Sequence, residues 1–324
     1  MAFLVTGGAG YLGSHIVKQL IEHYGENVVV LDNFSNGNRA KLARSVQIID
    51  ADITSPNLHN FFDTSSKFEG VFHIAAKKSV TQSVLNPDLY REVNIEGTRN
   101  ITELCKFLNI PRIVFASTAA VYGAGNEFGK IDETLDTSPA NPYGETKLYG
   151  EKLITALGLE TGTTHTSLRI FNLAGTADPL LFDFGGENVI SILLDKFTND
   201  KQFNIFGHQL GTPDGSCVRD YVHVSDVATA CISAMKSTKE ELPRVINLSS
   251  GIGKSVLELI ASLESITGKT LDTTKCEIRE GESESVIGDN TIAKEFLDWN
   301  PKKNIEMMLE DSWNAWSIHS NRAN

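Results

Sequence analysis

Residues 3–13 read FLVTGGAGYLG, an apolar run followed at once by a glycine-rich turn. The run predicts a buried strand, and residues 14–23 repeat apolar side chains at the period of a helix. Between them, Gly8, Gly10 and Gly13 fit the pattern G-x-G-x-x-G. Such glycines allow a tight turn and let a pyrophosphate approach the N–H groups at the helix start. A strand, a glycine turn and a helix in this order indicate a dinucleotide-binding unit.

A second apolar run at 28–31 ends at Asp32, about twenty residues past the last glycine. An acidic side chain at this place hydrogen-bonds the adenosine ribose of a dinucleotide and repels a 2′-phosphate. We therefore expect NAD rather than NADP as the cofactor. The alternative is a glycine turn with a purely structural role. The strand, the helix and Asp32 together argue against it.

A tyrosine followed four residues later by a lysine occurs once in the chain, at Tyr143 and Lys147. On a helix these side chains lie on one face, and Asn141 and Pro142 favour a helix start just before them. A free phenol has a pKa near ~10, and a neighbouring ammonium or a positively charged nicotinamide favours the phenolate. Such a tyrosine can take a proton from a sugar hydroxyl while a hydride leaves the same carbon. A chance pair on the surface is the alternative.

Strand and helix patterns alternate further along the chain, and Thr118 follows the strand predicted over 112–116. The carboxyl ends of strands form the edge at which open α/β sheets bind ligands, so Thr118 is a third candidate site residue. Other strands are expected at 46–49, 70–74 and 167–172, and a long helix at 94–108.

This alternation predicts an α/β fold with a doubly wound, mainly parallel Rossmann sheet and a smaller, interleaved substrate-binding lobe. The pattern becomes irregular after residue 172, where we expect the lobe to begin. We assign residues 1–172 and roughly 218–245 to the sheet domain, and roughly 173–217 and 246–324 to the lobe.

Composition limits the partners and the location of the protein. A net charge of −12 over 324 residues argues against nucleic acid or an anionic membrane as the main partner. No apolar run approaches the roughly 18–20 residues of a membrane span. The first strand begins almost at Met1, so no signal peptide is expected. The four cysteines form no C-x-x-C pair, which predicts reduced thiols in a cytoplasmic protein without a metal site.

The chain resembles the extended short-chain dehydrogenase/reductase superfamily, and within it closely resembles the UDP-glucose 4-epimerases. The resemblance runs nearly end to end and includes the glycine turn, Asp32 and the segments 117–123 and 142–147. Two further segments distinguish the epimerases from their relatives. They are RIFN at 169–172 and GTPDGSCVRDYVHV at 211–224.

The resemblance implies a role for each matching residue. Tyr143 would be the catalytic base, Lys147 its electrostatic partner, and Thr118 a hydrogen-bond donor or relay to the reacting sugar hydroxyl. Besides Tyr143 and Lys147, the implied NAD contacts are Gly7, Gly10, Tyr11, Leu12, Gly13, Asp32, Asn33, Asp52, Ile53, Lys78, Asn94 and Phe171. The implied UDP-sugar contacts are Thr118, Tyr143, Asn172, Asn188, Arg219 and Arg279.

The implied reaction is NAD-dependent epimerisation at C4 of a UDP-hexose, which interconverts UDP-glucose and UDP-galactose through a 4-keto sugar. The sugar would turn within the pocket while its nucleotide end supplies most of the binding energy. A homodimer is also implied, because the segments 94–108 and 143–157 correspond to helices that pair across a two-fold axis in the family. Their apolar residues fit an internal core equally well.

Other roles for individual residues remain open. Lys78 stands beside Lys77, and either could simply be solvated. His15 and His223 fit structural roles better than catalytic ones. The two arginines could form ordinary salt bridges with nearby carboxylates: Arg219 with Asp220 or Asp226, and Arg279 with Glu280 or Glu282.

Three other functions compete with 4-epimerisation of UDP-glucose. Nucleotide-sugar dehydratases and decarboxylases usually carry an acidic residue after the Ser/Thr turn, where this chain has Ala119 and Ala120. An enzyme for N-acetylhexosamines or pentoses is the second, because Val286 and Ile170 stand where tyrosine is common. We therefore expect activity on both UDP-glucose and UDP-N-acetylglucosamine. The third is a non-catalytic NAD-binding sensor, but such proteins typically lack the tyrosine and the lysine.

Overall fold

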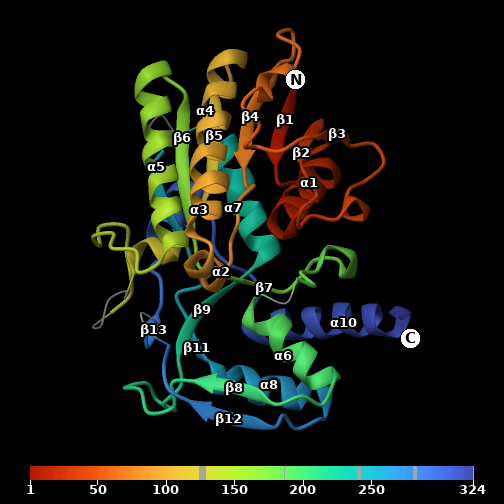
Figure 1. Cartoon of the computed structure of the whole chain (residues 1–324), viewed down its shortest axis with the longest axis vertical. Coiled ribbons are helices and arrows are strands. Elements are labelled where there is room, and N and C mark those ends of the chain that lie inside the picture. Colours follow the sequence, from red (N-terminus) through yellow and green to blue (C-terminus); the bar gives the residue numbers. More distant parts are fainter. Residues whose placement is uncertain (124–128, 186, 239–241, 280–282, 324) are drawn as a thin grey trace.

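The computed structural model describes residues 1–123, 129–185, 187–238, 242–279 and 283–323. A seven-stranded parallel sheet forms the larger, upper part of the molecule (Figure 1). Across the sheet, its strands follow the order β10 (Val245–Leu248), β6 (Thr164–Ile170), β5 (Arg112–Thr118), β4 (Phe68–His73), β1 (Ala2–Thr6), β2 (Val28–Asp32) and β3 (Gln47–Asp50). The predicted α/β class with a mainly parallel sheet is confirmed.

Helices cover both faces of this sheet. On one face α1 (Tyr11–Tyr24) packs against α7 (Val224–Lys236), and on the other α4 (Gly97–Leu108) packs against α5 (Pro142–Thr161). Successive side chains of a strand point to opposite faces, so each face has its own apolar core. Phe3 and Val5 join the core beneath α1 and α7, whereas Leu4 joins the core beneath α4 and α5.

Helix α5 begins where the sequence predicts it. The Asn141 side chain accepts a hydrogen bond of 2.9 Å from the Gly144 backbone N–H, and Pro142 occupies the first turn. The helix ends at Gly162, whose φ of 76° is the left-handed conformation that favours glycine. Because these local signals set where α5 begins and ends, they determine the direction in which the Tyr143 and Lys147 side chains point from the helix.

The predicted helix 94–108 differs at its start. The chain turns through α2 (Val80–Leu85), α3 (Pro87–Tyr90) and a π-helical segment, η3 (Arg91–Glu96), before α4 begins at Gly97. A π-helical turn is wider than an α-helical one and is frequent at functional sites. It contains Asn94, whose amide reaches the backbone of Lys77 beside the sheet edge.

The predicted strand 167–172 is two shorter strands. β6 ends at Ile170 in the main sheet, and β7 (Asn172–Ala174) pairs with β9 (Val218–His223) in a smaller sheet. The chain therefore crosses from the larger to the smaller part of the molecule at Phe171. The smaller sheet also contains β11 (Gly253–Ser255) and β13 (Ser285–Val286).

The lower part of the molecule contains a third apolar core. Its helices are α6 (Val189–Thr198), α8 (Val256–Thr267) and α10 (Ile305–Ala323), and β8 (Phe203–Phe206) pairs with β12 (Thr273–Cys276) (Figure 1). The remaining elements are α9 (Thr291–Leu297), η1 (Arg39–Lys41), η2 (Leu58–Phe61), η4 (Ala119–Tyr122) and η5 (Pro179–Leu181).

The division into a sheet domain and a lobe remains our proposal, with two adjusted boundaries. β10 lies in the main sheet, so we extend the sheet domain from 245 to Leu248. β9 pairs with β7, β11 and β13, so we move it to the lobe. Across the described ranges, no helix combines the length and the apolar character that crossing a membrane requires.

Candidate functional site

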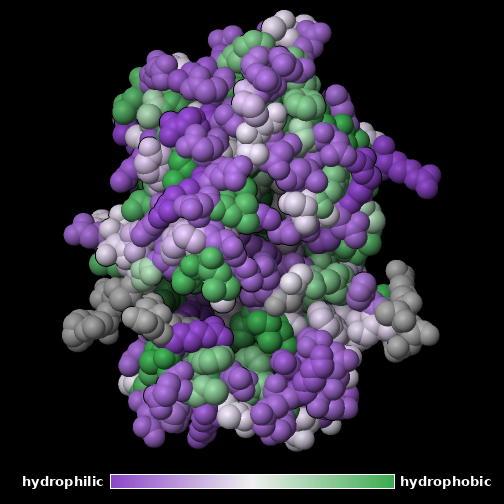
Figure 2. Space-filling model, in the orientation of Figure 1, coloured by the Kyte–Doolittle hydropathy of each residue, from purple (hydrophilic) through white to green (hydrophobic). Residues whose placement is uncertain are grey.

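A cleft of about 1370 Å³ lies where the carboxyl ends of the main strands meet the smaller lobe. The space-filling view shows a recess between the larger upper part and the lower part, with hydrophobic side chains at its rim (Figure 2). The cleft is lined by Gly7, Gly10, Tyr11, Leu12, Asp32, Asn33, Asp52, Ile53, Lys78, Thr118, Tyr143, Lys147, Phe171, Asn172, Asn188, Arg219 and Arg279.

The glycine turn forms one wall of the cleft. Gly7 has a φ of 69°, and a Cβ added to Gly13 would stand 2.1 Å from the Gly7 carbonyl oxygen. Gly13 therefore permits close packing of the turn and does not line the cleft itself. The N-cap of α1 is Gly10, and no side chain of the described residues caps the helix there. The N–H groups of its first turn, with the positive end of the helix dipole, fit a pyrophosphate.

The acidic end of β2 lies beside this turn. One Asp32 carboxylate oxygen accepts a hydrogen bond of 2.9 Å from the Ala9 N–H, and the other accepts one of 2.8 Å from the Phe34 N–H. A carboxylate has about four acceptor positions, so Asp32 retains capacity for ribose hydroxyls. The Asn33 amide donates to Asp52 at 2.5 Å. These residues, with the uncapped α1, fit the adenosine and pyrophosphate parts of a dinucleotide.

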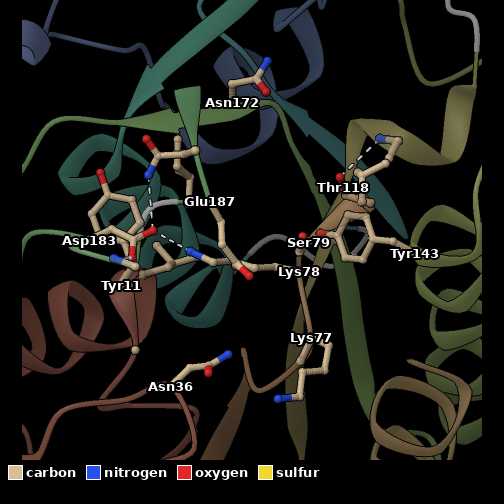
Figure 3. A pocket seen from close by; sticks show the side chains of 18 of the residues that line it. Tyr11, Asn36, Lys77, Lys78, Ser79, Thr118, Tyr143, Asn172, Asp183 and Glu187 are labelled. Atoms are coloured by element: carbon tan, nitrogen blue, oxygen red, sulfur yellow. Dashed lines mark hydrogen bonds and ion pairs between the residues drawn. The ribbon is translucent and has the colours of Figure 1, made fainter. Parts of the chain in front are cut away.

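Three candidate catalytic side chains meet deeper in the cleft. Thr118, at the end of β5, lies beside Tyr143 from the first turn of α5, and the two side chains interact. The two side chains lie next to each other in the close view (Figure 3). Lys147 follows one helical turn after Tyr143 and is 4% exposed. Its ammonium donates a hydrogen bond of 2.8 Å to the Ala116 carbonyl. The predicted spacing therefore brings these groups together.

Burial moves the pKa values of Tyr143 and Lys147 toward their neutral forms. It raises the pKa of Tyr143 to about 12, although the interaction with Thr118 acts in the opposite direction. It lowers the pKa of Lys147 to about 7, opposed by the Glu151 carboxylate. The chain alone thus keeps the phenol protonated at neutral pH. A phenolate depends on additional positive charge beside it.

Lys78 is paired rather than solvated. Its ammonium lies 2.5 Å from the Asp183 carboxylate, and the Asn188 amide donates to the same oxygen at 3.2 Å. Figure 3 shows Lys78 reaching across the cleft toward Asp183, beside Tyr11. Asp183 is a lining residue that the sequence patterns did not single out. It lies 105 residues from Lys78, and no local motif marks it.

Asn94, like Gly13, is a predicted NAD contact that does not line the cleft. It is 2% exposed, and its side chain accepts from the Lys77 N–H and donates to the Lys77 carbonyl and to Thr146. Asn94 therefore links the loop after β4 to α5. Its place in the structure is a support behind the cleft wall.

Arg219 faces the cleft from β9 and donates to the Val218 carbonyl at 2.8 Å. The Asp220 carboxylate accepts hydrogen bonds from the backbone of Ser250 and Gly251 on the neighbouring loop. The carboxylate of Asp226 accepts from the backbone N–H groups of Lys302 and Lys303.

Arg279 and Asn172 also face the cleft from the smaller lobe. The Arg279 guanidinium lies 3.8 Å from the centroid of the Phe206 ring. Glu280 and Glu282, its alternative partners, lie outside the described residues. The Asn172 side-chain amide donates a hydrogen bond of 3.2 Å to the Asp220 backbone carbonyl.

The two histidines fill structural positions. His15 donates to the Tyr11 carbonyl at 2.9 Å and accepts from the Ala177 N–H. His223 caps α7 by accepting from the Ser225 N–H at 3.0 Å. The polar side chains that line the cleft and that the sequence patterns did not single out include Asn36, Ser79 and Glu187 (Figure 3).

The sequence matches the NAD dependent epimerase/dehydratase family over residues 3–249. The chain belongs to this family. One relative is the UDP-glucose 4-epimerase of Halalkalibacterium halodurans, which is 38% identical over 98% of this chain and 96% of its own length. Family membership confirms the resemblance drawn from the motifs, and it confirms NAD as the cofactor.

Solved structures agree with the family assignment along the whole chain. The UDP-glucose 4-epimerase of Thermotoga maritima with UDP-glucose has a TM-score of 0.88 and 33% identity, covering 99% of this chain and 100% of its own. The enzyme of Stenotrophomonas maltophila, with bound NAD and formylated UDP-arabinopyranose, has a TM-score of 0.92 and 30% identity. It covers 100% of both chains.

Proposed function

We propose that this protein is an NAD-dependent UDP-glucose 4-epimerase, which interconverts UDP-glucose and UDP-galactose. The observation that carries the proposal is the meeting of Thr118, Tyr143 and Lys147 in one cleft with the uncapped glycine turn. Relatives that match this chain over nearly their full length carry the same activity in their names. An NAD-binding sensor has no need for this catalytic arrangement.

Bound NAD supplies a reversible hydride acceptor. The chain's own part is to move the proton and to hold the sugar. Tyr143 takes the proton of the sugar 4-hydroxyl and returns it after the 4-keto sugar has turned. Thr118 hydrogen-bonds the reacting oxygens and keeps the phenol in place. Tyr143 acts as a phenolate, and the Lys147 ammonium stabilises that phenolate before it takes the proton and after it returns it.

The smaller lobe would bind the nucleotide end of the substrate. Arg219 and Arg279 face the cleft, and guanidinium groups bind phosphate oxygens in pairs. Asn172 and Asn188 supply amides from β7 and from the start of α6. Binding concentrated on UDP leaves the hexose free to turn, which inversion at C4 requires.

The residues beside Thr118 argue against a dehydratase. Ala119 and Ala120 form the start of η4 and line the cleft. A methyl group can neither donate nor accept a proton, so water elimination has no acid at this place.

We propose that the same site also accepts UDP-N-acetylhexosamines. Val286 of β13 and Ile170 at the end of β6 both line the cleft. These aliphatic side chains occupy less volume than tyrosine and leave room beside the sugar for an N-acetyl group.

We propose that the protein acts as a cytoplasmic homodimer. The proposed interface is the outer face of α4 and α5, where Tyr149 is 43% exposed and interacts with Arg99 of α4. Cys105, Cys217, Cys231 and Cys276 are free thiols, which suits a reducing compartment.

The test is incubation of the purified protein with UDP-galactose and NAD, without any external reductant. UDP-glucose should form, because each cycle regenerates the cofactor. Tyr143→Phe should lower kcat by about 10²–10⁴-fold while NAD still binds. UDP-N-acetylgalactosamine in the same assay tests the second substrate class. NAD binding without conversion of either sugar would leave a sensor as the better account.

A further inference from the structure

Helix α5 presents three polar side chains to β5 at intervals of four residues: Tyr143, Lys147 and Glu151. Each interacts with a different member of a run of three residues at the end of β5. Tyr143 interacts with Thr118, and Lys147 donates a hydrogen bond of 2.8 Å to the Ala116 carbonyl. Glu151 accepts from the Ser117 hydroxyl at 2.5 Å. The first two contacts belong to the proposed catalytic machinery, and the third has no role there so far.

Glu151 is fixed in place by a neighbour on β6. Its two carboxylate oxygens accept from Nε and Nη2 of Arg169 at 2.9 and 2.8 Å, a bidentate pair. Both side chains are nearly inaccessible, at 7% and 6% exposure. Arg169 in turn lies over the Tyr122 ring, 4.7 Å from its centroid. The carboxylate therefore has one well-defined position behind the catalytic residues.

We propose that Glu151 is a positioning residue of the epimerase, whose buried carboxylate lies one helical turn from Lys147 and favours the ammonium form of that lysine during the reaction. This inference rests on the proposed function, since only proton transfer at Tyr143 gives the charge of Lys147 a catalytic purpose. Arg169 and Ser117 act by orienting the Glu151 carboxylate. None of these three residues needs to touch the substrate.

The groups facing Lys147 support this role. Tyr143 and Glu151 face it from α5, and His73 faces it from β4. Burial and the Lys147 charge lower the pKa of His73 to about 3, so the imidazole is neutral. Glu151 brings a negative charge near the ammonium, and Arg169, which pairs with that carboxylate, places a positive charge behind it. Burial lowers the pKa of Lys147 to about 7 even with Glu151 in place, so without this carboxylate the amine would lose its proton at a lower pH.

The competing explanation is a buried ion pair that only stabilises the fold. Removing one member of such a pair leaves the other charge buried and unpaired, which is strongly destabilising. The test therefore uses Glu151→Gln alone and together with Arg169→Gln. The glutamine keeps an acceptor for Ser117, and the double variant removes both charges. Glu160→Gln, an exposed change on the same helix, is the matched control.

The decisive readout is the titration of Lys147 itself, followed by NMR of protein labelled at the lysine side-chain carbons. Lys147→Met identifies the signal. The pKa of Lys147 should fall by about one unit in both Glu151→Gln variants and stay unchanged in Glu160→Gln. The alkaline limb of the kcat profile should move toward acid by the same amount, since the reaction uses the ammonium.

Two results would overturn the proposal. One is a Lys147 titration that Glu151→Gln leaves where it was. The other is a shift in the single variant that disappears in the double variant, because an unpaired arginine would then be its cause. The titration needs no turnover, so this test is separate from the question of whether the wild-type protein converts UDP-galactose.

Discussion

Tyr143 and Lys147 meet in a nearly dry environment that favours the neutral form of each. Burial raises the pKa of the phenol to about 12 and lowers that of the amine to about 7. The pattern of a tyrosine and a lysine at this spacing predicts the pair and its common face. It cannot predict the direction of the phenol shift, because burial depends on residues distant in the sequence.

Replacing Lys147 by methionine should lower activity and raise stability at neutral pH. The amine titrates near pH 10.5 in the unfolded chain and near pH 7 in the fold, so the unfolded chain binds the extra proton between these values. Wild-type stability should therefore rise with pH through this window, and Lys147→Met lacks that dependence. We expect kcat to fall by about 10²–10⁴-fold.

Urea unfolding at pH 7 and at pH 10 checks the stability part. The advantage of the methionine variant over wild type should be largest at pH 7 and shrink by pH 10. An equal difference at the two pH values would contradict the assigned burial effect. Measuring kcat at pH 7 in the same preparations checks the catalytic part.

At the scale of helices and strands, the sequence predicts features that depend on near neighbours well. It predicts poorly where the chain passes from one sheet to another. The start of α5 follows from Asn141 and Pro142, because a cap is a contact between near neighbours. The run 167–172 reads as one strand, yet the chain leaves the main sheet after Ile170. The pairing of β7 with β9 decides this, and β9 lies far along the sequence.

The same limit applies to the site. The sequence alone predicts the glycine turn, Asp32 and the Tyr143–Lys147 pair, because each is a local motif with a known physical role. Asp183 was missed because its partner, Lys78, lies 105 residues away. The sequence could have indicated Glu151, because this residue continues the four-residue spacing of Tyr143 and Lys147 along α5.

The whole molecule places the proposed cofactor turn on the large sheet and the two arginines on the smaller lobe, with one cleft between them. Because the two parts interleave along the chain, neither half of the sequence contains a complete site. The outer face of α4 and α5 lies away from the α1 and α7 side of the sheet. A second copy can therefore pair there without covering the other layer.

The proposed dimer predicts a particle of twice the 35.4 kDa chain mass in sedimentation equilibrium at micromolar concentration. Tyr149→Glu should shift the protein toward monomer, because it places a charge in the proposed interface. Met307→Glu, a change at a similarly exposed position on α10, should leave the dimer intact. A wild-type monomer at these concentrations would refute the proposal.

The central claim is that the Tyr143 site removes and returns hydride at one sugar carbon. The most direct test is conversion of UDP-galactose carrying deuterium at C4, in ordinary water with NAD, followed by NMR. Our account predicts UDP-glucose that retains the deuterium at C4, since the hydride never exchanges with solvent. UDP-glucose with protium at C4 would contradict it.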